Sequence, residues 1–302
     1  MITLTGLDGS NPLGFLAALG VLRVLTDRGC DARLAWVQRG RWVPELSADL
    51  EVGALLDLLD LDRRGWSQEM ALQLCYSKDG GPGDGRDLKP RPEDLRAWLI
   101  RLLEDGSPRS VALTAAFFTE SAQDNNGNTK PTALHFTAGQ QEFLTMAREL
   151  QAGVTRADLE EALIGPWRYQ RTLPVFGWDC SASRDYALRA SDPSKDKKTG
   201  VPGADWLALM GLAFLPVAPD GDSVRTPGCS GEWKTGLYTW PLWTVPLRAP
   251  TVQSLLVHPR LKDPRKLSAA ERQALGIGAI YRSGIRRSEQ GGYGSFRPST
   301  PL

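Results

Sequence analysis

The chain opens with the sequence MITLTGLDGSNPLGFLAALGVLRVL, residues Met1 to Leu25. Apolar residues that alternate with threonines at its start predict a short strand. Asn11 and Pro12 then predict the beginning of a helix, because an asparagine side chain caps free N–H groups and proline suits the first helical position. Apolar residues at helical spacing continue to Leu25. Small residues among them, such as Gly14 and Ala18, give the predicted helix a smooth face.

The bulk composition is that of a folded protein with enough material for a large core. The chain has 302 residues, of which 41% are hydrophobic and 24% charged, and its formal net charge is +1. A net charge so close to zero means that binding to nucleic acid or membranes would depend on local patches. The four cysteines are widely spaced, which is typical of a reducing compartment, and the start has no signal-peptide pattern. We therefore expect a cytoplasmic protein without membrane contact.

Turn residues and apolar spacing divide the rest of the chain into short elements. Strands are predicted at 33–37 and 42–46 as a hairpin, at 111–119, at 133–137 and twice within 232–247, and helices at 48–61, 92–106, 139–152 and 204–215. Thr155 with Asp158, and Ser268 with Glu271, have the spacing of capping boxes at two further helix starts.

These elements predict an α+β fold with a helix-rich N-terminal half and a C-terminal half richer in strands and loops. From Gly165 onward, aromatic residues, proline and glycine become frequent. We expect one large globular unit over residues 1–302. The alternative is a split near the polar run 121–128, giving an N-terminal unit, residues 1–130, with helices and a small sheet, and a C-terminal unit, residues 131–302, rich in aromatic residues and arginine.

No sequence pattern for catalysis or metal binding stands out. The glycine-rich run 80–86 lacks the Gly-Lys-Ser/Thr of a phosphate-binding loop. The two histidines, His135 and His258, have neither a visible partner nor the spacing of metal ligands. We therefore predict that the protein is not an enzyme and holds no cofactor and no metal. The alternative is a nuclease or small-molecule hydrolase that uses His135 with nearby polar residues of the run 121–128.

Cations interleaved with aromatic rings are the better signal. The run 167–171 reads Trp-Arg-Tyr-Gln-Arg, and nine lysines and arginines downstream of His258 outnumber three acidic residues, a net charge of +6. Rings can stack on bases while cations hold phosphates, so this pattern indicates nucleic-acid binding. The ordinary alternative is that the arginines lie along apolar surface and the tryptophans belong to the core. The predicted nucleic-acid-binding residues are Arg168, Tyr169, Arg171, Arg184, Arg189, Lys197, Lys198, Arg286 and Arg287.

Five blocks of sequence follow one another along the chain: Gly6-Leu7-Asp8-Gly9-Ser10-Asn11-Pro12-Leu13-Gly14-Phe15-Leu16-Ala17-Ala18-Leu19-Gly20, Gly177-Trp178-Asp179, Arg184-Asp185-Tyr186-Ala187-Leu188-Arg189, Gly203-Ala204-Asp205-Trp206-Leu207-Ala208 and Thr239-Trp240-Pro241-Leu242-Trp243. Together they resemble stretches of subunits in type I-G (formerly I-U) CRISPR–Cas systems. Their order over most of the chain makes the resemblance more specific than any single block.

The resemblance implies a non-catalytic protein of an RNA-guided antiviral complex, similar to its large subunit or to an extension of its nuclease-helicase. In such complexes, base pairing with the guide RNA reads the target sequence, while protein contacts the duplex beside it. The expected partners are therefore other type I-G effector subunits, with target DNA, guide RNA or both. A remaining alternative is a purely structural scaffold whose Gly14/Ala18 face docks onto a partner helix.

Overall fold

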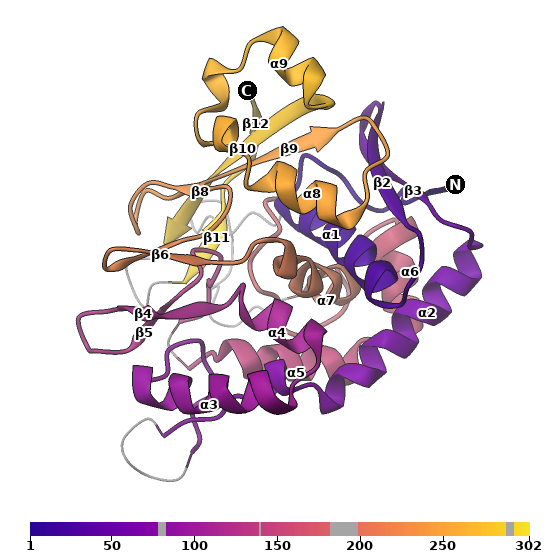
Figure 1. Cartoon of the computed structure of the whole chain (residues 1–302). Coiled ribbons are helices and arrows are strands. Elements are labelled where there is room, and N and C mark those ends of the chain that lie inside the picture. Colours follow the sequence, from indigo (N-terminus) through magenta and orange to yellow (C-terminus); the bar gives the residue numbers. More distant parts are fainter. Residues whose placement is uncertain (78–82, 139, 182–198, 288–292) are drawn as a thin grey trace, which may run out of the picture.

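The computed structural model describes residues 1–77, 83–138, 140–181, 199–287 and 293–302. It contains helices and antiparallel sheets together, which confirms the predicted α+β class (Figure 1). The helices are α1 (Pro12–Asp27), α2 (Val52–Gly65), α3 (Pro92–Asp105), α4 (Pro108–Thr114), α5 (Phe143–Gly153), α6 (Arg156–Ile164), α7 (Pro202–Gly211), α8 (Ala249–Leu256) and α9 (Ala269–Ala274). Short 3₁₀ segments lie at Trp66–Gln68, Met70–Leu72, Leu212–Phe214, Pro259–Lys262 and Pro264–Lys266.

Two antiparallel sheets and two separate hairpins make up the strands. The first sheet has the order β1-β3-β2, formed by β1 (Ile2–Thr3), β2 (Arg33–Arg39) and β3 (Arg41–Ser47). The larger sheet has the order β11-β10-β9-β8, with β12 also on β10; its strands are β8 (Cys229–Ser230), β9 (Leu237–Trp243), β10 (Ile277–Arg287), β11 (Gly294–Phe296) and β12 (Thr300–Pro301). The hairpins are β4 (Phe118–Gln123) with β5 (Thr129–Pro131), and β6 (Ala218–Asp220) with β7 (Ser223–Arg225).

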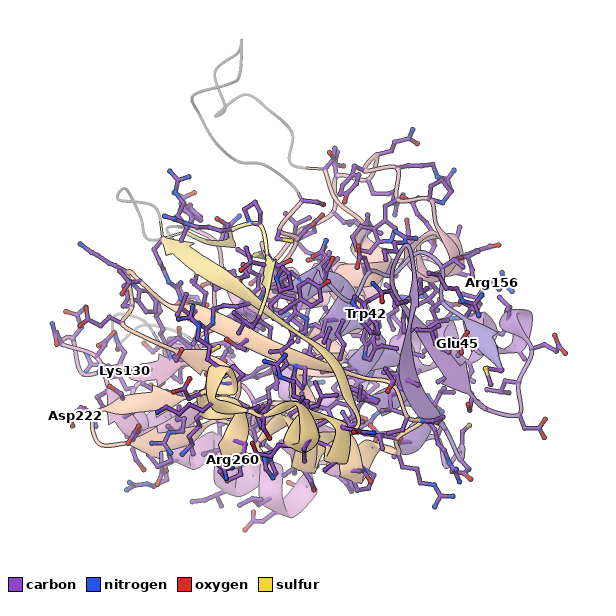
Figure 2. All side chains as sticks on the ribbon, turned by 90° about the horizontal axis from the view of Figure 1, so that it is seen from above. Trp42, Glu45, Lys130, Arg156, Asp222 and Arg260 are labelled. Atoms are coloured by element: carbon purple, nitrogen blue, oxygen red, sulfur yellow. The ribbon has the colours of Figure 1, made fainter. Side chains whose placement is uncertain are left out.

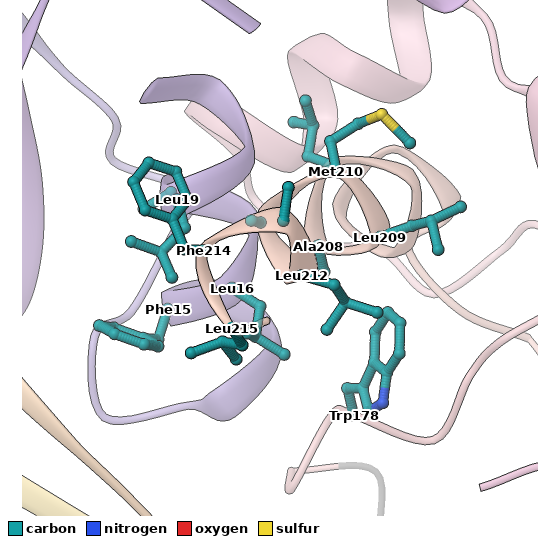
Figure 3. Packing of buried hydrophobic residues seen from close by; sticks show 14 of the residues in the cluster. Phe15, Leu16, Leu19, Trp178, Ala208, Leu209, Met210, Leu212, Phe214 and Leu215 are labelled. Atoms are coloured by element: carbon teal, nitrogen blue, oxygen red, sulfur yellow. The ribbon is translucent and has the colours of Figure 1, made fainter. Parts of the chain in front are cut away.

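Helices α1 and α7 cross in the middle of the core. Their backbones touch at Gly20, where an added Cβ would lie 1.8 Å from the carbonyl oxygen of Leu207. Figure 3 shows apolar side chains of both helices, among them Leu16 and Leu209, beside this crossing. The smooth face of α1 therefore packs inside the molecule, with Ala18 fully buried, and that face is not available to a partner helix.

The same helix joins the two sheets. The ring of Phe15 packs on Trp36 of β2 at 5.9 Å and on Trp243 of β9 at 6.3 Å, measured between ring centroids. Leu34 and Leu247 exchange two backbone hydrogen bonds of 2.9 Å, so β2 also binds the chain that follows β9. At the other side of the molecule, Lys130 donates to the carbonyl oxygen of Asp222, and Figure 2 shows the two residues side by side on neighbouring hairpins.

Several local expectations differ from the structure. The predicted strand 111–119 begins as the end of α4 and becomes strand only from Phe118. The stretch 133–137 is buried, irregular chain rather than a strand, and 232–247 contains one strand, β9, instead of two. These stretches are apolar enough for either kind of element, and packing against distant segments decides between them.

Candidate functional site

A cleft of about 580 Å³ lies beside the loop that connects β1 to α1. This loop, residues 5–11, forms one wall, and the chain from Ile164 to Trp167 at the end of α6 forms another. Arg41, Tyr169 and the pair Cys180-Ser181 complete the lining. In Figure 1, β3 and α6 lie on the same side of the molecule as the N-terminus. The cleft thus joins segments that are far apart in the sequence.

The loop follows the end of α6 closely because its first residues bind there. The backbone N–H of Gly6 donates to the carbonyl oxygen of Leu163 at 2.8 Å, and the hydroxyl of Thr5 donates to that of Ile164 at 2.8 Å. A Cβ on Gly6 would lie 2.4 Å from the carbonyl oxygen of Ala162. Only glycine permits this approach of the two backbones.

Asn11 connects the start of α1 to the far wall of the cleft. Its Oδ1 accepts from the backbone N–H of Leu13 at 3.0 Å, as the sequence predicts for a helix cap. Its Nδ2 donates to Oδ1 of Asp179 at 2.7 Å. One side chain therefore caps a helix and holds a residue 168 positions away.

Asp179 organises that wall. Its Oδ1 also accepts from the backbone N–H of Ser181 at 2.9 Å and from the hydroxyl of Ser181 at 2.7 Å. Its Oδ2 accepts from the hydroxyl of Tyr169 at 2.9 Å. Within the described ranges, these hydrogen-bond donors stabilise the carboxylate of Asp179.

Tyr169 is held in an unusual backbone conformation. Its φ is 55°, and no other non-glycine residue in the described ranges has a positive φ. A left-handed backbone costs an ordinary residue about 1–2 kcal/mol, so the bonds of its hydroxyl to Asp179 and Ser181 help to hold it. Burial, with the charge of Asp179, raises the pKa of Tyr169. The phenol is therefore neutral and acts as a hydrogen-bond donor.

Asp8 is a carboxylate that lines the cleft itself. Its Oδ1 accepts from the backbone N–H and from the hydroxyl of Ser10, both at 2.8 Å. Within the described ranges, Oδ2 of Asp8 has no hydrogen-bond partner. The cleft therefore offers an oriented acceptor to a ligand.

Two aromatic rings stand next to these carboxylates. The indole N–H of Trp167 donates to the carbonyl oxygen of Ala162 at 3.0 Å, which fixes the ring. Trp167 and Tyr169 meet edge to face, with ring centroids 6.2 Å apart. Trp178, by contrast, is fully buried and donates to the carbonyl oxygen of Leu134, so its ring belongs to the core.

Three arginines surround this region. The guanidinium of Arg41 donates to the carbonyl oxygen of Thr5 while the residue stays exposed. Arg168 pairs with Glu161 at 3.3 Å and Arg171 with Asp158 at 3.1 Å, yet their side chains are 58% and 45% exposed. These two predicted binding residues are therefore partly neutralised by acidic residues of α6, Arg171 at the first turn of that helix, and neither of them lines the cleft.

The other predicted binding residues lie elsewhere. Arg286 and Arg287 are at the end of β10, and neither lines the cleft. Arg287 donates to the carbonyl oxygens of His135 and Ala133 and stacks on Trp233 at 3.6 Å. Burial lowers its pKa to about 10. Its guanidinium thus serves internal contacts. Arg184, Arg189, Lys197 and Lys198 lie outside the described residues.

His135, the base of the enzymatic alternative, is fully buried. Its Nε2 lies 2.7 Å from Oδ1 of Asp87 and 2.7 Å from the hydroxyl of Thr137, and its ring stacks on Phe143. These polar partners come from outside the run 121–128, and His135 does not line the cleft. The imidazole therefore has an internal, structural environment.

Sequence reasoning missed Asp8, Arg41 and Asp179 as members of one site. Residues 5–11 have the pattern of a helix start, which hides a second role for Asp8 and Asn11. The signal that points to both segments is the resemblance, since the first two similar blocks contain Asn11 and Asp179. Their contact depends on the tertiary fold, which local patterns do not encode.

No protein-family model matches the chain, and no curated protein matches it either. Among the described residues, no three His, Cys, Asp or Glu side chains gather as a metal ion requires. The helices of the described ranges are also too short or too polar to cross a membrane.

Proposed function

We propose that the chain is a cytoplasmic, non-catalytic component of a type I-G CRISPR effector that binds nucleic acid and partner subunits. The observation that carries the proposal is the convergence of the family-like blocks. Asn11 of the first block binds Asp179 of the second, and Gly20 touches Leu207 of the block that forms α7. The indole of Trp240, from the last block, donates to the carbonyl oxygen of Gly9 at 2.8 Å.

This convergence supports a shared functional region rather than a set of unrelated likenesses. Residues that merely fill a core need no polar contacts to one another, but two of these links are side-chain hydrogen bonds that involve the loop 5–11. That loop lines the cleft. The resemblance and the cleft thus coincide in space.

The side chains at the cleft suit a single strand of nucleic acid. Trp167 and Tyr169 offer aromatic surface, and base stacking on such rings contributes about 1–3 kcal/mol per base. Arg41 lines the cleft, and Arg168 and Arg171, which do not line it, follow Trp167 in the chain with exposed guanidinium groups that can contact phosphates. In an RNA-guided complex this contact would hold a strand while base pairing reads the sequence.

Binding of a labelled single-stranded DNA, at two salt concentrations, tests the nucleic-acid role. In the double variant Arg168→Gln/Arg171→Gln we expect the affinity to fall about tenfold and the salt dependence to weaken, because each lost phosphate contact lowers the log–log slope by roughly 0.7. The matched control is Arg225→Gln/Arg248→Gln. These two arginines are similarly exposed, 54% and 56%, and each pairs with an aspartate away from the cleft.

Equal losses in the two double variants would show that only net charge matters and would contradict binding at the cleft. Absence of salt-sensitive binding, both by the isolated chain and by the chain with its co-purified partners, would contradict nucleic-acid binding altogether. The effector role is tested by purifying a tagged copy from its native cell. We expect effector subunits and guide RNA to co-purify, and a chain that purifies without them would contradict the proposal.

A further inference from the structure

We propose that the cleft beside the loop 5–11 receives one unstacked guanine base of a single strand, with the Asp8 carboxylate accepting from the base. The proposal rests on the proposed function, since it names what the nucleic-acid site takes. It follows from three features of the cleft: its acceptor, its aromatic walls and the position of its cations.

The size of the cleft fits one nucleotide. Small-molecule sites in proteins enclose roughly 300–1,000 Å³, and the cleft, at about 580 Å³, falls within that range. A base that enters alone must leave its stack, which is how proteins read single-stranded nucleic acid. The cleft has room for a base and its sugar but not for a duplex.

The acceptor selects among the four bases. Oδ1 of Asp8 is oriented by two donors from Ser10, which leaves both lone pairs of Oδ2 for a ligand. Guanine is the base that presents two adjacent N–H donors, N1–H and the N2 amino group, on its pairing edge. Adenine and cytosine place a ring acceptor beside their amino group, and thymine places a carbonyl oxygen on either side of its N–H. A carboxylate repels all three arrangements more than that of guanine.

The walls hold a flat ring next to that acceptor. The ring of Trp167 is held by the hydrogen bond of its indole N–H, and that of Tyr169 by the hydrogen bond of its hydroxyl to Asp179. Both rings are therefore already in place when a base binds. Preorganised surfaces of this kind reduce the entropy lost on binding.

The charges place the phosphate at the rim. Asp8 lines the cleft and Asp179 lies behind it, bound to the lining residues Asn11 and Ser181, so both carboxylates repel phosphate from the interior. Arg41, by contrast, lines the cleft and is exposed. The same guanidinium disfavours the main competing occupant, an arginine side chain of a partner protein. A second guanidinium would be repelled by Arg41, but a neutral guanine would not.

The test compares nine-residue oligothymidylates that carry one central guanine, inosine or adenine. Fluorescence anisotropy of labelled strands gives each affinity for the full chain. We expect guanine to bind about tenfold more tightly than adenine, and inosine to fall between them because it lacks the N2 amino group. In Asp8→Asn the ratio of guanine to adenine affinities should collapse towards one, because the amide replaces an acceptor oxygen with a donor.

The control variant is Asp49→Asn, which changes the same charge at an exposed residue outside the cleft and should keep the tenfold ratio. Thermal melting checks that Asp8→Asn still folds, and Asp8→Glu, which keeps the carboxylate, should retain a preference for guanine.

Equal affinities for the three strands would overturn the guanine assignment alone. No binding to any strand would overturn the proposed function as well. Displacement of the guanine strand by argininamide but not by guanosine monophosphate would assign the cleft to a protein partner and overturn the proposal.

Discussion

At the scale of single residues, the pair of Asp87 and His135 shows how strongly the fold holds one carboxylate. Oδ1 of Asp87 lies 2.7 Å from Nε2 of His135 and accepts from the backbone N–H of Phe143 at 3.2 Å. Burial raises the pKa of Asp87, but His135 and the hydrogen bonds outweigh it and lower the pKa from 3.8 to about 2. A carboxylate with a lowered pKa stabilises the fold above its unfolded-state pKa and loses that contribution as the pH falls towards its folded-state pKa.

We therefore expect Asp87→Asn to flatten the acid side of the stability profile. Between about pH 5 and about pH 2, the free energy of unfolding of the unchanged chain should fall by roughly 2 kcal/mol more than that of the variant. Urea titrations at successive pH values measure both curves. Curves that stay parallel over this range would show that Asp87 does not contribute to acid sensitivity.

Asn11 gives a second prediction at this scale, because it combines two roles. In Asn11→Ala the helix α1 loses its cap, which costs about 1 kcal/mol, and Asp179 loses a donor, which costs a further 1–3 kcal/mol or so. Ser268, the cap of α9, is exposed and makes only local bonds, so Ser268→Ala should cost about 1 kcal/mol. Urea denaturation compares them, and equal losses would mean that the bond to Asp179 contributes no stability.

At the scale of elements, the crossing of α1 and α7 depends on the absence of a side chain at Gly20. The methyl group of Gly20→Ala would meet the backbone of Leu207, which cannot move without separating the helices. We expect a loss of about 1–3 kcal/mol, measured by thermal or urea unfolding. Gly53 in α2 is the matched control, since a Cβ there would have only Arg156 at 3.9 Å. Gly53→Ala should stabilise by about 0.5–1 kcal/mol. A stabilising Gly20→Ala would contradict the close approach.

Elements with strong local signals are the ones that the sequence predicts well. The cap at Asn11, the hairpin 33–46 and the two capping boxes at Thr155 and Ser268 are confirmed, because each depends on residues a few positions apart. The helix predicted from 48 begins only at Val52, and the predicted strand 133–137 is irregular chain. In the stretch 133–137, hydrogen bonds of Ala133 to Thr226 and of His135 to Asp87 replace strand pairing, and both partners are distant in sequence.

The cleft is harder to predict than any element for the same reason. Asp8 of its lining and Asp179, which binds the lining residues Asn11 and Ser181, belong to segments that local patterns describe as a helix start and as irregular chain. The sequence pattern predicts binding at Arg168, Tyr169 and Arg171, of which only Tyr169 lines the cleft, and also at Arg287, whose guanidinium is turned inward. Charge and ring content identify a region, whereas burial decides which side chains remain accessible.

At the scale of the whole molecule, the contacts of α1 extend across the alternative boundary near residue 130. This helix packs on α7, and Phe15 packs on Trp243 of β9, so its buried face belongs to both halves. The indole of Trp243 also donates to the carbonyl oxygen of Leu34 at 2.6 Å. A fragment that ends at residue 130 would expose these apolar surfaces to water, at about 25 cal/mol for each Å².

We therefore expect that neither fragment, 1–130 or 131–302, folds alone. Each should lack a cooperative thermal transition when followed by circular dichroism, while the intact chain should show one. Co-expression of the two fragments should restore a cooperative transition, because the face of α1 then finds α7 and β9 again. A cooperative transition of the isolated fragment 1–130 would mean that its own hairpins and helices suffice to bury α1. In that case the hydrogen bond of Trp243 to Leu34 would join two independent units. Removing that bond should then make the two units melt at different temperatures.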